Sequence, residues 1–138
     1  MKPLYTTTAV ATGDGRNGHV QTIDGVLVAP VRTPKELGGE GGATNPEQLF
    51  AAGYAACFHS ALKLVAGKAK ADTTDSEVVA DVSLGMLETG GFGLTANIEV
   101  SLPALERDVA EQIVAQAHQV CPYSNATRGN MDVTLSVA

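Results

Sequence analysis

The sequence predicts a single α+β domain over residues 1–138. Short runs that alternate between apolar and polar residues are typical of strands, and two longer stretches have helical periodicity. No repeat or shift in composition marks a second domain. The chain has 138 residues, of which 44% are hydrophobic and 17% charged. It is therefore long enough to bury a core without disulfides, and too apolar to be disordered.

Two strands are expected in the N-terminal third, over residues 4–12 and 18–30. Both runs are rich in Thr, Val and Ile, which favour strands. A glycine-rich loop at residues 13–18 separates them. Pro30 and Pro34 are expected to end the second strand.

A long helix is expected to begin after Asn45 and to run to about Val65. Asn45 is a favourable N-cap, Pro46 suits the first helical position, and Gln48 stands three residues after the cap. Gly67 is expected to end the helix. Since the segment is apolar nearly all round, we expect burial on most faces, within the domain or against a partner chain.

The C-terminal half is predicted to contain strands, an amphipathic helix and a last strand. Strands at residues 78–88 and 94–102 flank a glycine-rich hairpin turn at 90–93, and residues 131–137 alternate almost strictly. A helix is expected over about 104–120. Its apolar face comprises Leu105, Val109, Ile113, Ala117 and Val120.

Charge and composition narrow the class of function. Nine Lys and Arg against fifteen Asp and Glu give a net charge of −6, which argues against nucleic-acid or anionic-membrane partners. We find no uninterrupted run of ~18 apolar residues, so no membrane span is expected. The N-terminus has no apolar signal segment, so we expect a cytoplasmic protein with reduced thiols.

Cys57 and Cys121 are the residues best suited to chemistry. From the residues alone they are a redox pair or two buried thiols, and both interpretations stay open. Cys57 lies within the first helix, where its sulfur would lie near Gly53. Cys121 precedes a polar, turn-rich segment and is expected to be the more accessible and mobile of the two. No Cys-x-x-Cys motif is present.

A zinc site built from Cys57, His59, His118 and Cys121 is disfavoured. Positions two apart on a helix point about 200° away from each other, so Cys57 and His59 cannot converge on one ion. We therefore expect no metal site.

An aromatic stripe follows the first helix at positions i, i+4 and i+8: Phe50, Tyr54 and Phe58. Core packing explains this spacing. The same stripe is also a candidate for one wall of an apolar, substrate-binding channel beside the cysteine.

Three segments, residues 36–58, 121–130 and 90–94, closely resemble the organic hydroperoxide resistance (Ohr) proteins of the OsmC/Ohr family. The resemblance covers essentially the whole chain and favours the Ohr branch. It implies antiparallel sheets around a long buried central helix, in an intertwined homodimer with two interfacial active sites. It also implies a thiol peroxidase of the oxidative stress response, without metal or organic cofactor. Such a peroxidase reduces alkyl and fatty-acid hydroperoxides and is recycled by dihydrolipoyl groups of lipoylated proteins.

The matched motif positions imply a role for each site residue. Cys57 would be the peroxidatic cysteine and Cys121 the resolving one. Glu47 would hold an active-site arginine in a bidentate pair, and that arginine is placed at Arg16, with Arg32 as the other candidate. The guanidinium would favour the thiolate, which is the attacking species.

The separation of Glu47 and Cys57 raises the question of which chain supplies each group. Ten helical residues correspond to about 15 Å along the axis. Two central helices packed antiparallel about a dyad would bring Glu47 of one chain beside Cys57 of the other. A helix broken near Gly53 is the alternative.

Two other functions remain alternatives at this point. One is an OsmC-type peroxidase of broader specificity. The other is a non-enzymatic protein that binds a small ligand and keeps its cysteines in the core.

Overall fold

The structure is a computed structural model that describes residues 1–138, and it has the α+β composition that the sequence predicts. Six strands form two three-stranded sheets, accompanied by three α-helices and one 3-10 turn, η1 (Lys35–Leu37). The residues group into two units, Met1–Leu49 and Phe50–Ala138. Each unit is described separately below, and a single domain over 1–138 stays a prediction.

The N-terminal unit contains an antiparallel sheet in the order β1 (Ala9–Asp14), β2 (Asn17–Thr22) and β3 (Val28–Val31). The single strand expected over residues 18–30 is therefore two strands. The backbones of Thr22 and Leu27 are hydrogen bonded across a turn, and the Asp24 carboxylate accepts a backbone N–H within it. Pro30 lies inside β3, an edge strand whose free side tolerates the missing N–H donor.

Helix α1 (Pro46–Lys68) begins as predicted and is unbroken at Gly53. The Asn45 side-chain oxygen accepts the backbone N–H of Gln48 at 2.9 Å, which confirms the predicted N-cap. The alternative of a helix broken near Gly53 is therefore wrong.

The predicted end of this helix at Gly67 is also wrong. The helix continues to Lys68, and the chain then turns at Lys70, whose backbone is left-handed with φ 54°. The backbone N–H of Ala71 bonds the carbonyl of Ala66 at 2.9 Å, which is a helix-ending pattern that needs no glycine.

Only one face of α1 is buried within the chain, so burial of most faces, expected within the domain or against a partner chain, stays a prediction. The buried residues are Tyr54, Phe58, Ala61, Leu62, Val65 and Ala66. Ala52, Ala56, Ser60 and Leu64 form an exposed stripe along the opposite face. By length and composition alone α1 could cross a membrane, contrary to the sequence-based expectation, and core helices of soluble proteins meet the same criterion.

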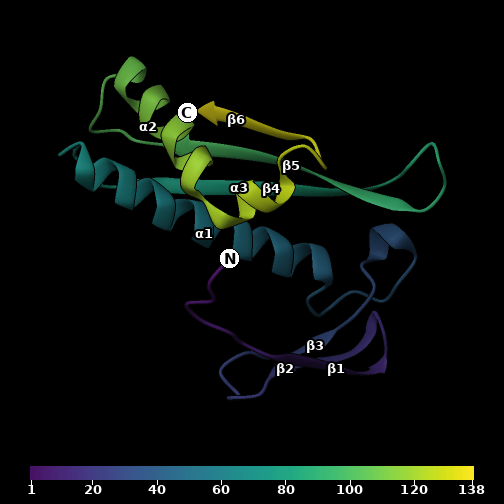
Figure 1. The fold of residues 1–138 in the computed structure, drawn as a ribbon. Coiled ribbons are helices and arrows are strands. Elements are labelled where there is room, and N and C mark those ends of the chain that lie inside the picture. The colour runs from purple at the N-terminus through teal and green to yellow at the C-terminus, as the bar shows by residue number, and fades with distance from the viewer. The chain divides into compact units, whose positions relative to one another are not determined.

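The second sheet lies in the C-terminal unit, in the order β4 (Glu77–Met86), β5 (Phe92–Ser101) and β6 (Val133–Val137). The β4–β5 hairpin is antiparallel, but β6 runs parallel to β5, so the predicted wholly antiparallel arrangement is wrong for this sheet. Helices α2 (Arg107–Val120) and α3 (Pro122–Thr127) lie between these strands in the sequence and provide the crossover that a parallel pair requires (Figure 1).

The core of this unit lies between the inner face of the sheet and the helices. Ala96, Ile98 and Val100 of β5 are buried together with the inner face of α1. The buried residues of α2 are Ala110, Ile113, Val114 and Ala117. Val109 and Val120, which were expected on this face, are substantially exposed, so the apolar face of α2 is rotated from the predicted one.

Candidate active site

The structure brings Cys57 and Cys121 together although 64 positions separate them. Their sulfur atoms are 3.8 Å apart, and both thiols are free. Cys57 lies on α1 and is half-buried, whereas Cys121 lies at the junction of α2 and α3 and is 0% exposed. The expectation that Cys121 is the more accessible thiol is therefore wrong.

Cys121 is buried because the segment after it forms a helix that folds onto the core. Pro122 occupies the first position of α3, where its fixed φ favours the helix and its missing N–H costs nothing. Ser124 and Thr127 turn their hydroxyls inward to the phenol of Tyr54, at 2.9 Å and 3.1 Å. The polar, turn-rich sequence therefore forms a helix in which the Ser124 and Thr127 hydroxyls are buried and hydrogen bonded, while Asn125 stays exposed.

Burial raises the pKa of the Cys57 thiol above its usual range. Loss of solvation is the largest cause, because it disfavours the charged thiolate. The backbone N–H of Tyr123 opposes this effect, while the neighbouring Cys121 adds to it. A thiol in this state needs a cation nearby before it can react as a thiolate at neutral pH.

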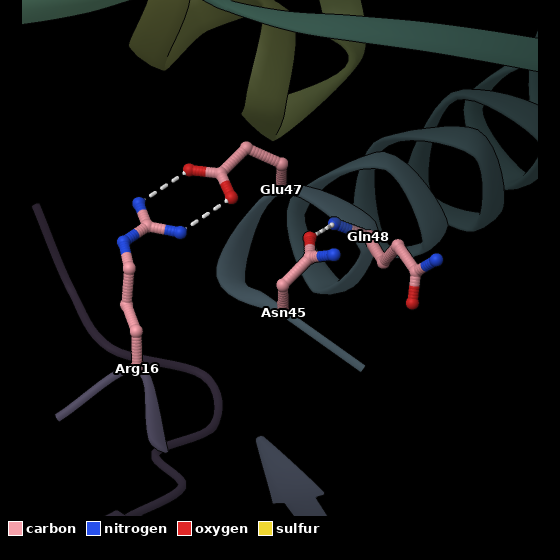
Figure 2. Close-up of polar contacts among 4 residues, drawn as sticks. All are labelled: Arg16, Asn45, Glu47 and Gln48. Carbon is pink, nitrogen blue, oxygen red and sulfur yellow. Dashed lines mark hydrogen bonds and ion pairs between the residues drawn. The ribbon is translucent and has the colours of Figure 1, made fainter. Parts of the chain in front are cut away.

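Arg16 and Glu47 form a forked ion pair in the N-terminal unit, as Figure 2 shows. The two guanidinium nitrogens donate to the two carboxylate oxygens at 2.8 Å and 2.7 Å, which is the bidentate geometry proposed from the sequence. The hydrogen bond from Arg16 lowers the pKa of Glu47, and the same bond raises the pKa of Arg16. Both groups are therefore charged at any physiological pH.

Local structure fixes both members of this pair. Arg16 stands in the two-residue turn between β1 and β2, directly after Gly15, whose φ of 60° suits the first position of a tight hairpin turn. Glu47 lies in the first turn of α1, where the positive end of the helix dipole favours a carboxylate. The other candidate, Arg32, donates instead to the backbone carbonyls of Gly18 and Val31.

An apolar cavity of about 650 Å³ opens in the C-terminal unit. Its lining includes Phe50, Leu87, Phe92, Leu94, Tyr123 and Met131. Of the predicted aromatic stripe only Phe50 reaches the cavity, because Tyr54 and Phe58 are fully buried in the core. Tyr54 and Phe58 therefore do not line this cavity, and a substrate wall formed by the stripe stays a prediction.

Tyr123 connects the cavity to the cysteines and was missed by sequence reasoning. Its ring lines the cavity and packs on the rings of Tyr54 and Phe50, with centroid separations of 5.6 Å and 6.1 Å. The ring lies directly against the backbone of α1 at Gly53, where an added Cβ would be 2.7 Å from the phenol oxygen. The signal for this residue was its place two positions after Cys121, within the segment that resembles the family.

The histidines are not gathered into a metal site. His59 Nε2 is hydrogen bonded to Ser76 Oγ at 2.9 Å, and no group of three or more His, Cys, Asp or Glu side chains is placed to hold an ion.

The fold and the paired thiols define an α+β protein with two cysteines in contact, one on a long helix and one at a helix junction. Residues 39–136 match the family model described as OsmC-like protein. The chain belongs to this family, and within it to the organic hydroperoxide resistance branch.

Close relatives of known name support the assignment to this branch. The chain is 52% identical to an organic hydroperoxide resistance protein of Xanthomonas axonopodis pv. citri, over 99% of this chain and 96% of the relative. A crystal structure of an organic hydroperoxide resistance protein from Legionella pneumophila superimposes with a TM-score of 0.95 at 55% identity, over 99% of both chains. The structure of a putative organic hydroperoxide resistance protein from Vibrio cholerae, with captopril bound in one of its active sites, superimposes with a TM-score of 0.94. It is 50% identical to this chain, over 99% of this chain and 94% of that one.

Proposed function

We propose that this protein is a cysteine-based peroxidase that reduces organic hydroperoxides to alcohols. The Cys57 thiolate attacks the terminal peroxide oxygen, so that the O–O bond breaks, the sulfur becomes a sulfenic acid and the alcohol leaves with a proton. The Cys121 thiol then attacks the sulfenic sulfur, which forms a disulfide and releases water. The observation that carries this proposal is the 3.8 Å separation of two free sulfur atoms.

The character of the cavity supports an organic substrate. Its lining is mainly apolar, and Tyr123, which forms part of its wall, stands two residues after Cys121. Each CH₂ group buried there would contribute up to ~0.8 kcal/mol, so a few methylenes give a tenfold or larger preference over hydrogen peroxide. The names of the relatives refer to the same class of compound.

We assign the Arg16–Glu47 pair the task of activating Cys57. Because burial raises the pKa of this thiol, a fixed guanidinium beside it would restore the thiolate. The bidentate geometry keeps the guanidinium charge in one orientation. The unbroken course of α1 supports an arrangement in trans, with the pair of one chain serving Cys57 of another.

An intertwined homodimer agrees with the surfaces that the chain leaves exposed. Val10, Ile23, Val26 and Val28, from the sheet of the N-terminal unit and the turn within it, are exposed. The stripe Ala52, Ala56, Ser60 and Leu64 is exposed on α1. Exposed apolar residues that gather on a sheet and along one helix face are typical of a subunit interface.

A mixed-dimer experiment tests the arrangement in trans. Cys57→Ser chains and Glu47→Ala chains are each expected to be inactive alone. In a heterodimer one site then carries both lesions and the other is intact, so activity returns on mixing. A mixture that stays inactive after proven chain exchange would show that one chain builds the whole site.

Thiol titration before and after one equivalent of an organic hydroperoxide tests the chemistry itself. The wild type should lose two thiols as an intramolecular disulfide. Cys57→Ser should not lose its remaining thiol at the rate at which the wild type reacts. Cys121→Ser should consume one equivalent and then stall or overoxidise. Equal first-turnover rates for Cys57→Ser and wild type would exclude the peroxidatic role.

The remaining parts of the proposal concern the cellular context. We propose recycling by dihydrolipoyl groups and a cytoplasmic location, where a reduced dithiol donor is present. Dihydrolipoamide should sustain turnover with a fatty-acid hydroperoxide. Comparable kcat/KM for hydrogen peroxide would favour the OsmC-type alternative, and retention of both thiols would favour the non-enzymatic one.

A further inference from the structure

The hydroxyl of Tyr54 is a buried polar group that the peroxidase chemistry leaves without a role. Its side chain is 0% exposed and lies on α1, three residues before Cys57. The phenol is hydrogen bonded to Ser124 Oγ at 2.9 Å and to Thr127 Oγ1 at 3.1 Å, both on α3. Because α3 begins directly after Cys121, these bonds join the helix that carries one cysteine to the segment that carries the other.

All three hydroxyl protons are used in this cluster. Thr127 Oγ1 donates to the carbonyl of Ser124 at 3.2 Å, so it accepts from Tyr54. Ser124 in turn donates to the Tyr54 oxygen. The cluster has one consistent arrangement, and a fully satisfied buried network of this kind holds the groups that it joins in a fixed place.

We propose that the Tyr54 hydroxyl is a positioning group that holds α3, and with it the Cys121 thiol, ready to attack oxidised Cys57. This inference rests on the proposed peroxidase function and adds a residue to its second step. To form the disulfide, the sulfurs must close from 3.8 Å to about 2.05 Å, with water leaving from the Cys57 sulfenic acid. The competing step is attack of the sulfenate on a second hydroperoxide, which breaks another O–O bond and gives a sulfinic acid and an alcohol.

The hydroxyl has no bond to either sulfur, so its removal should spare the first step. Tyr54→Phe keeps the ring but leaves the Ser124 hydroxyl buried without its side-chain partner. The segment after Cys121 then loses its hydrogen bonds to α1. We expect disulfide formation to slow about tenfold while the second-order rate of Cys57 oxidation changes by less than about twofold.

The experiment uses the full-length reduced protein and tert-butyl hydroperoxide, with stopped-flow kinetics and intact-mass analysis. The mass spectrum distinguishes the disulfide from the sulfinic acid at increasing peroxide. Tyr54→Phe should shift the product toward sulfinic acid, and Tyr5→Phe, which deletes the same atom at an exposed site, should not. Thr127→Val should reproduce the shift, whereas Thr127→Ser, which keeps the hydroxyl, should resemble the wild type.

The outcomes separate this proposal from the one on which it rests. If the wild type formed no disulfide, the peroxidase function itself would fail. If the wild type forms it and Tyr54→Phe gives the same proportion of sulfinic acid, only the positioning role is wrong. A Tyr54→Phe variant that loses both steps equally would show general damage to the fold and would also overturn the inference.

Discussion

Replacement of Gly53 by alanine tests the contact that places Tyr123 beside the cysteines. In an open helical position this change stabilises a protein by about 0.5–1 kcal/mol, because glycine has the higher conformational entropy when unfolded. At Gly53 the new Cβ would lie 2.7 Å from the Tyr123 oxygen and 3.2 Å from two ring carbons. Such distances are well inside normal contact, so the ring or the helix must move.

The cost of that movement can be estimated from the packing around the ring. The Tyr123 ring is in contact with those of Phe50 and Tyr54, so it cannot rotate away without disturbing both. Overpacking typically costs about 1–3 kcal/mol, and the lower part of this range applies because the ring is 37% exposed and borders the cavity, toward which it can shift. Combined with the helical gain, Gly53→Ala should lower the free energy of unfolding by up to about 1 kcal/mol.

Gly67→Ala is the matched control in the same helix. No atom lies within 4 Å of the added Cβ there, so this variant should be more stable than the wild type by up to about 1 kcal/mol. Urea unfolding of the reduced proteins, followed by circular dichroism at one protein concentration, measures both changes. If the two alanine variants proved equally stable, the close approach of Tyr123 to α1 would be refuted.

Four further predictions concern the ion pair, the cap and the cavity. Arg16→Met should shift the pH dependence of the alkylation rate of Cys57 by iodoacetamide to higher pH, because no guanidinium then offsets the effect of burial on the thiol pKa. An unchanged pH profile would count against activation by this arginine. Folding lowers the pKa of Glu47, so the ionised carboxylate stabilises the folded protein at pH values above the usual glutamate range. This stabilisation is lost as the pH falls through the folded-state pKa. Glu47→Gln should therefore lose less stability than the wild type between about pH 6 and about pH 3. Asn45→Ala should lower the unfolding free energy by about 1 kcal/mol, and Asn45→Ser should restore most of it, as denaturation would show. Phe92→Asp, at a cavity residue that is 72% exposed, should raise KM for a bulky hydroperoxide more than for hydrogen peroxide, and an equal effect on both would remove the cavity from substrate binding.

Local signals were sufficient for the elements whose ends are set by neighbouring residues. The N-cap at Asn45, the hairpin between β4 and β5 and the alternation of β6 all depend on a few consecutive positions, and each was predicted. The errors came where a local signal was overridden. Gly67 did not stop α1 because Lys70 makes the turn, and residues 18–30 were divided by a turn that resembles strand sequence.

The sequence by itself indicated two cysteines suited to chemistry, and its resemblance to the family added an arginine in a glycine-rich loop and a glutamate in the first turn of a helix. Only the tertiary structure decided that Cys121 is buried and that its sulfur lies 3.8 Å from that of Cys57. That distance depends on how α3 packs on α1 through the hydroxyls of Tyr54, Ser124 and Thr127. Ser124 and Thr127 lie 70 or more positions after Tyr54 in the chain. Periodicity and capping report on neighbours within one or two turns, whereas a contact over such a separation exists only when the whole core has assembled.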